Sequence, residues 1–104
     1  MNRVIISGRL TATPELKTTP SGKSVSSFRI AVDRNNGKDE TDFLTVVTWD
    51  HTAEFVTKYL EKGRKIIVGG KLHTRSYNDA NGNVRNVTEV YADSVEFADS
   101  APAR

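Results

Sequence analysis

The sequence predicts an all-β fold, a closed barrel of five strands with one helix between the third strand and the fourth. Five segments have the composition of strands, and their apolar residues recur mostly with a period of two, which is typical of strands. A pair of glycines interrupts the fourth segment, where a bulge or bend would let a sheet curl. The length of 104 residues fits a single domain.

Turn residues separate the first three predicted strands. Residues 3–10 and 25–33 alternate between apolar and polar side chains, and the turn sequence Thr19-Pro20-Ser21-Gly22 lies between them. Residues 35–40 are all polar or glycine, which predicts a mobile loop. Residues 41–49 are rich in β-branched and aromatic side chains, and they form the third predicted strand.

One helix follows directly. Asp50 is the expected N-cap, and Gly63 is the expected residue at which the helix ends. Ala53, Val56 and Leu60 share one face at helical spacing. We expect this face to cover one end of the barrel, with no part in ligand binding.

A hairpin completes the fold. Residues 64–77 form the fourth predicted strand, bent at Gly69-Gly70, and residues 85–97 form the fifth. Asn81-Gly82 between them is typical of a tight turn. Three strands, a helix and a hairpin are the element order of the OB-fold, a small Greek-key barrel. We therefore expect one OB-fold domain over residues 1–98 and a disordered end over residues 99–104.

Several classes of protein are excluded by composition. The chain has no Cys, so it can form neither disulfides nor cysteine metal sites. The apolar run at residues 4–6 is too short for a signal peptide, and no stretch approaches the ~20 apolar residues of a membrane helix. These observations predict a cytoplasmic protein without a membrane partner.

The sequence offers no constellation for catalysis. His51 and His73 lie on different predicted elements, and without Cys no zinc-ligand spacing can be recognised. Asp39, Glu40 and Asp42 cluster in or beside the predicted mobile loop, where carboxylates make poor acid–base pairs. We expect no enzymatic activity, no cofactor and no metal.

Aromatic and basic side chains share faces of two predicted strands. Phe43 and Trp49 have the same parity on the third strand, so both emerge on one face. The fourth strand places four such side chains on one face, Lys71, His73, Arg75 and Tyr77. Unpaired bases stack on rings while cations neutralise phosphates, as single-stranded nucleic acid requires. The alternatives are packing or a subunit interface for the rings, and a solvated surface for the cations.

The basic residues are unevenly distributed. The net charge is only +2, yet residues 1–33 carry five Lys or Arg against two Asp or Glu, and residues 64–85 carry five against one. Two basic segments could converge into a surface for a polyanion. Strands one and three are apolar on both faces, more than one small barrel can bury, which predicts an oligomer.

Short motifs along residues 2–97 carry a resemblance to a known family. They include Asn2-Arg3-Val4-Ile5-Ile6-Ser7-Gly8-Arg9-Leu10, Pro14-Glu15-Leu16, Pro20-Ser21-Gly22-Lys23, Phe28-Arg29-Ile30-Ala31-Val32, Tyr59-Leu60-Glu61-Lys62-Gly63, and Gly70-Lys71-Leu72-His73-Thr74-Arg75-Ser76-Tyr77. Asp42-Phe43, Val46-Val47-Thr48-Trp49, Gly82 and Val87-Thr88-Glu89-Val90 complete the set. In this order, the motifs closely resemble bacterial single-stranded DNA-binding proteins.

The resemblance implies an OB-fold protein, usually a homotetramer, that wraps single-stranded DNA during replication, recombination and repair. It implies that Phe43, Trp49 and Tyr77 stack on bases. It also implies phosphate contacts from basic residues at the matching positions, namely Arg3, Arg9, Arg34, Lys62, Lys71, Arg75 and Arg85. The alternative is a related OB-fold module whose main function is in protein interactions. Primosomal replication protein N, which is similar to this family, is such a module.

The sequence departs from the family pattern in two places. Some members have another stacking aromatic just after the second strand, where this chain has Arg34-Asn35-Asn36. Many members continue into a long tail with an acidic tip that recruits repair and replication enzymes. This sequence ends at Ala101-Pro102-Ala103-Arg104. We therefore expect either a truncated chain or a short paralogue or phage-type member, located in the bacterial cytoplasm with the nucleoid or, if encoded by a phage, in the host cytoplasm. In each case partners recruited through a tail are not expected.

Overall fold

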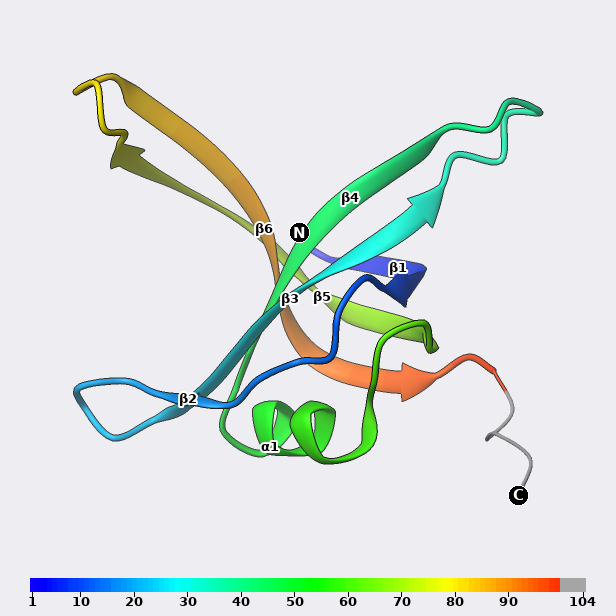
Figure 1. Ribbon diagram of the computed structural model, residues 1–104, viewed down its shortest axis with the longest axis horizontal. Helices are drawn as coiled ribbons and strands as arrows, with labels where there is room; N and C mark the ends of the chain where they lie inside the picture. The colour runs from blue at the N-terminus through cyan, green and yellow to red at the C-terminus, as the bar shows by residue number, and fades with distance from the viewer. Residues whose placement is uncertain (100–104) are drawn as a thin grey trace.

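The computed structural model describes residues 1–99 and has six strands and one helix (Figure 1). In chain order these are β1 (Val4–Leu10), β2 (Lys17–Thr18), β3 (Ser24–Asp33), β4 (Thr41–Trp49), α1 (Asp50–Tyr59), β5 (Lys65–Asn78) and β6 (Val84–Phe97). The five predicted strands are present, and the two-residue β2 is added beside β3. The predicted disordered end lies outside the described residues, apart from Asp99.

Five of the strands close into a ring. Their order is β1-β5-β6-β4-β3, and β3 returns to β1 through two pairs, Arg9 with Ala31 and Leu10 with Ile30. All pairings are antiparallel except β4 with β6, which run parallel. The closed ring, with α1 between β4 and β5, confirms the predicted OB-fold.

The predicted bend in β5 lies at Gly69 and Gly70. The pairing of β5 with β6 shifts between these two residues, which leaves Asp93 of β6 without a partner on β5. A Cβ atom at Gly70 would collide with the backbone of Tyr91. Only glycine therefore permits the close approach of the two strands at this bulge.

Two hairpins extend from the ring as diverging arms (Figure 1). One arm consists of the last part of β3 and the first part of β4, and the other consists of the last part of β5 and the first part of β6. In the second arm, Asp79 and Asn83 close the turn by a backbone hydrogen bond of 2.9 Å, and Gly82 adopts a φ of +79°. The tight turn predicted at Asn81-Gly82 is confirmed.

The core lies between the ring and α1. Ile30, Val46, Val56, Ile66 and Val68 are fully buried. The predicted apolar face of α1 packs against this core, since its members, Ala53, Val56 and Leu60, are at most 3% exposed.

The ends of α1 differ from the prediction. Trp49, not Asp50, is the N-cap, and it makes no capping side-chain hydrogen bond. Asp50 has a φ of +53°, because the chain turns from β4 into the helix without a loop and this residue makes the turn. The helix ends at Tyr59, before Gly63, which instead turns the chain into β5 and donates a backbone hydrogen bond to Leu10.

An ion pair holds the chain after β6 against the start of β5. The Arg64 guanidinium donates to the Asp99 carboxylate, with Nε and Nη2 at 3.1 and 2.9 Å from Oδ1. The backbone N–H of Lys65 donates to the same carboxylate at 3.1 Å. These hydrogen bonds lower the pKa of Asp99 below its usual 3.8, the Arg64 side chain contributing most.

The lowered pKa predicts how Asp99→Asn changes stability with pH. A carboxyl whose pKa is depressed on folding stabilises the folded state above its unfolded pKa, and this stabilisation is lost as pH falls through the folded pKa. We expect Asp99→Asn to unfold more easily than the parent at neutral pH, with the difference disappearing in acid. Urea unfolding at several pH values measures this. Asp39→Asn, which removes no ion pair of the described residues, is the control. A difference that is the same at all pH values would contradict the prediction.

Candidate nucleic-acid interface

Alternation along four neighbouring strands brings the aromatic and basic side chains to one outer face. The strands are adjacent in the order β3-β4-β6-β5, and their pairings place Ala31 beside Phe43, and Val47 and Lys71 beside Tyr91. We define the aromatic face by the outward residues around these pairings that carry rings or positive charge, Arg29, Phe43, Trp49, Lys71, His73, Arg75, Tyr77, Arg85 and Tyr91. Val46, the inward neighbour on β4, is fully buried, as its parity predicts.

Three rings form a continuous cluster at the base of the two arms. The rings of Trp49 and Tyr91 have centroids 4.5 Å apart and meet edge to face. The imidazole of His73 stacks on Tyr91 with a centroid distance of 4.2 Å and an interplanar angle of 20°. The cluster therefore joins β4 to β5 through β6. Sequence reasoning did not select Tyr91, because nothing in the sequence shows which face of β6 lies beside Trp49.

An exposed ring lies further out on each arm, and each has an arginine beside it. Phe43 is 54% exposed, and the guanidinium carbon of Arg29 lies 5.3 Å from its ring centroid. Tyr77 is 48% exposed, and Arg75 lies 5.8 Å from its ring. Arg29 is absent from the predicted phosphate contacts, although the alternation of residues 25–33 places it outward and could have identified it.

Arg75 is fixed by a buried carboxylate. The Glu89 side chain is 7% exposed and accepts a hydrogen bond of 2.9 Å from Nε of Arg75. This hydrogen bond and the negative charge raise the pKa of Arg75, so its guanidinium stays charged. A single ion pair therefore positions the predicted phosphate contact next to Tyr77.

Three more of the predicted phosphate contacts also have carboxylate partners. Arg3 binds Asp93 at 2.8 Å, Arg34 binds Glu40 and Asp42 at 2.9 Å, and Arg85 binds Asp79 at 2.8 Å. All three arginines are about half exposed. A phosphate would compete with these carboxylates or share the guanidinium with them.

The remaining predicted phosphate contacts divide between two places. Lys71 lies on the aromatic face, beside Tyr91 in register. Arg9 donates to the Gly63 carbonyl at 3.0 Å, and Lys62 precedes Gly63, so both lie at the α1–β5 connection. The structure therefore gathers Lys71, Arg75, Tyr77 and Arg85 on one face but places Arg9 and Lys62 elsewhere.

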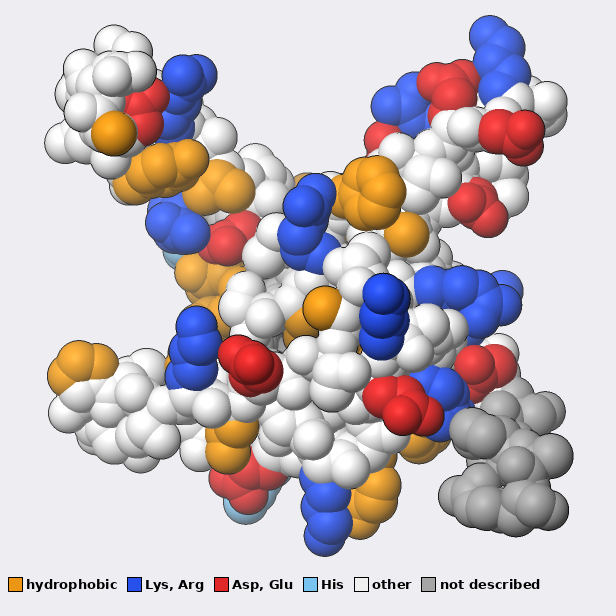
Figure 2. Space-filling model, in the orientation of Figure 1, with side chains coloured by type: hydrophobic (Ala, Val, Ile, Leu, Met, Phe, Trp, Pro, Cys, Tyr) orange, Lys and Arg blue, Asp and Glu red, His pale blue; other side chains and the backbone are white. Residues whose placement is uncertain are grey.

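On the face of the molecule that Figure 2 shows, positive and negative side chains are intermixed rather than gathered into one patch. Figure 2 shows Lys and Arg side chains over both arms and the space between them, with Asp or Glu beside several. This agrees with the ion pairs above and with the small net charge of +2. Attraction of a polyanion therefore depends on local geometry more than on a broad positive field.

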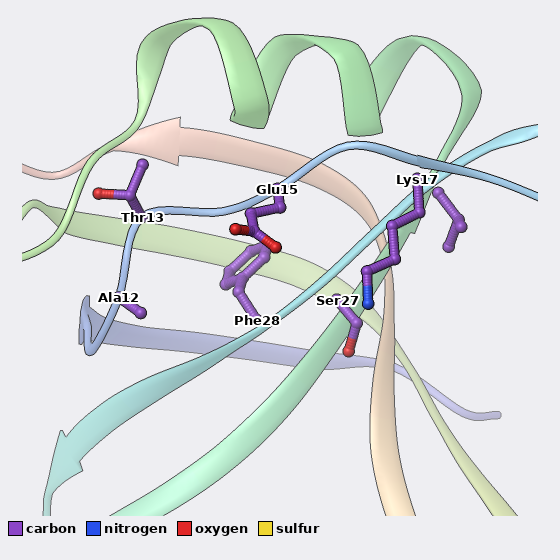
Figure 3. Close-up of a pocket in the computed structure, with 7 residues that line it drawn as sticks. Ala12, Thr13, Glu15, Lys17, Ser27 and Phe28 are labelled. Carbon is purple, nitrogen blue, oxygen red and sulfur yellow. The ribbon is translucent and has the colours of Figure 1, made fainter.

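A hollow of about 390 Å³ lies between β3 and the connection from β1 (Figure 3). Glu15 extends into it from the connection and Lys17 from β2, and its lining also includes Val25 and Ser27 of β3. Val25 is paired with Trp49, so the hollow adjoins the aromatic face at its β3 edge. Its one carboxylate and one amine suggest no reaction.

Two further structural findings concern residues 1–99. No three His, Asp or Glu side chains in this range gather as metal ligands would. Within the same range, no helix has the length and apolar character to cross a membrane.

Comparison with known proteins identifies the family. A model of the single-strand binding protein family matches residues 1–98. The chain belongs to this family. Membership confirms the resemblance seen in the motifs, and it supports the prediction that the chain is not an enzyme, since this is a family of DNA-binding proteins.

Relatives from several bacteria are similar over nearly the whole chain. The chain is 50% identical to a single-stranded DNA-binding protein of Clostridium tetani over 101 residues, covering 93% of the chain and 70% of that protein. It is 46% identical to single-stranded DNA-binding protein 3 of Clostridium acetobutylicum and to single-stranded DNA-binding protein 2 of Listeria monocytogenes. Both alignments include 93% of this chain, and they cover 70% of the Clostridium acetobutylicum protein and 63% of the Listeria monocytogenes protein.

Proposed function

We propose that this member of the single-strand binding protein family binds single-stranded DNA with little sequence preference. The observation that carries the proposal is the aromatic face, where the exposed rings of Phe43 and Tyr77 and the half-buried ring of Trp49 lie among cations across four adjacent strands. The relatives named above are single-stranded DNA-binding proteins, which supports the same function. The proposed role is protection of single-stranded DNA during replication, recombination and repair in the bacterial cytoplasm.

The proposed mechanism is base stacking combined with phosphate neutralisation. Phe43, Trp49 and Tyr77 each offer a ring to a base, and every base has a face that can stack, so sequence matters little. In a duplex the base faces are already covered by neighbouring pairs, so the rings have nothing to stack on. The mechanism therefore selects single strands without reading base edges.

Phosphate neutralisation falls first to cations without a carboxylate partner. Of the seven predicted phosphate contacts, Arg9, Lys62 and Lys71 make no ion pair among residues 1–99, and Arg29 is a further candidate. Arg75 remains held by Glu89, with its position beside Tyr77 fixed. The other three, Arg3, Arg34 and Arg85, contribute only where a phosphate replaces or joins their carboxylates.

We also propose that the protein is a homo-oligomer, with four subunits as the family resemblance implies. Residues 4–8 of β1 pair with β5 on one side only, because β3 pairs with β1 no further than Arg9 and Leu10. Ile5 in this segment is 73% exposed. An unpaired strand edge with an exposed apolar side chain favours association with a second copy.

Replacing the ring of Trp49 tests the proposed binding site. Trp49→Ala should weaken the affinity for oligo-dT by roughly 1–3 kcal/mol, the value for one base–aromatic stack, and Phe43→Ala should cost a similar amount. Affinity is measured by the anisotropy of a labelled oligonucleotide. If Trp49→Ala changes the oligomeric state and leaves affinity unchanged, the ring belongs to a subunit interface and the site is misplaced.

Val46→Ala is the matched control on the same strand. Val46 is fully buried and points inward, so its truncation should lower the free energy of unfolding by about 2 kcal/mol. The folded variant should keep its affinity for oligo-dT. A loss of affinity as large as that of Trp49→Ala would mean that general destabilisation explains both results.

The dependence of the binding constant on salt concentration measures how many phosphate contacts the protein makes. For an oligo-dT that fills one domain, four unpaired cations predict a slope of log K against log salt of about −3, at about −0.7 for each contact. A slope nearly twice as steep would mean that the paired arginines also bind phosphates. An affinity that does not change with salt would contradict the role of the cations.

Substitution of Ile5 tests the oligomer. Light scattering should show an assembly larger than the 11.5 kDa of one chain at micromolar concentration. Ile5→Lys should shift the assembly toward smaller species, because it places a charge in the proposed contact. Val84→Lys, at an exposed apolar residue on the β5–β6 arm, is the control and should leave the mass unchanged. A stable monomer before substitution would contradict this part of the proposal.

A further inference from the structure

We propose that His73 is a fourth base-stacking ring and that Tyr91 is the positioning residue that holds it. The proposal rests on the proposed binding of single-stranded DNA and extends the site beyond the three rings that the family resemblance implies. It is carried by the stacked arrangement of the two rings, at 4.2 Å and 20°.

The two rings of this stack differ in what they can offer a base. Tyr91 is half-buried and contacts both His73 and Trp49. His73 is exposed, and only one face of its imidazole is covered by Tyr91. The opposite face of the imidazole is therefore available for stacking, with its orientation set by the tyrosine beneath it.

The position of His73 also fits the proposed path of the strand. Trp49 lies at the base of the arms, and Tyr77 lies four residues beyond His73 on β5, which is about 13 Å along an extended strand. A base on His73 would occupy the interval between these two rings. The path from Trp49 to the β5–β6 arm then has a stacking surface at its centre.

The charges around His73 are arranged to accept a nucleotide there. Lys71 and Arg75 flank it at two-residue spacing on the same face of β5. Glu89 is its partner across the β5–β6 pairing, but this carboxylate is buried and bound to Arg75. A phosphate beside His73 therefore has a cation on either side of it along β5, and the carboxylate opposite His73 is already paired.

Substitutions that separate the ring from its charge test the proposal. His73→Gln removes the aromatic face and should weaken binding of labelled oligo-dT about fivefold or more, the lower end of the range for one stack. His73→Phe keeps an aromatic face and should remain within about twofold of the parent. His73→Lys supplies a cation without a ring and should lose as much affinity as His73→Gln. Thr74→Ala, on the opposite face of β5, is the control and should bind as the parent does.

Two outcomes would overturn the inference. One is unchanged affinity in His73→Gln, with urea unfolding showing that the variant is folded. The other is full affinity in His73→Lys combined with a loss in His73→Phe, which would assign the residue a purely electrostatic role. Trp49→Ala in the same series separates the two proposals. If it weakens binding while His73→Gln does not, only this inference fails, and if the parent protein does not bind oligo-dT, both fail.

Discussion

The architecture depends on the close approach of β5 and β6 at Gly70. The backbone of Tyr91 occupies the space that a Cβ atom would need there, and the bulge at Asp93 changes the register of the two strands. Before this point β5 contributes Ile66 and Val68 to the core, and after it every residue of β5 is exposed. One long strand pair can therefore close the barrel and also form an arm.

The same constraint builds the proposed site. Tyr91 pairs with Lys71, in the position next to the last β5–β6 pair before the bulge, which is Gly70 with Ala92. Its ring contacts Trp49 on β4 and His73 on β5. A shift of β6 by one residue would turn this ring to the other side of the sheet. Because most arginines around the site are already paired with carboxylates, stacking on a preformed set of rings accounts for more of the proposed recognition than charge does.

Much of this arrangement could be predicted from the sequence, because period-two alternation is local. It placed Phe43, Trp49 and Tyr77 outward and Val46 inward, and the glycine pair predicted the bulge. The ion partners could not be predicted, since Arg3 and Asp93 are 90 residues apart and meet only because β1 and β6 both pair with β5. The prediction of Asp50 as the N-cap was wrong, because this residue makes the turn from β4 into α1. Tyr91 was missed because a neighbour across a parallel strand pair leaves no periodic signal.

The most direct test of the central claim uses the single tryptophan, which lies within the proposed stacking surface. Its emission is followed while oligo-dT, or a duplex of the same length, is added to the protein. The account predicts strong, saturable quenching by oligo-dT as a base stacks on the indole, and a much smaller change with the duplex. Equal quenching and equal affinity for the duplex, or binding of oligo-dT without any change in emission, would contradict it.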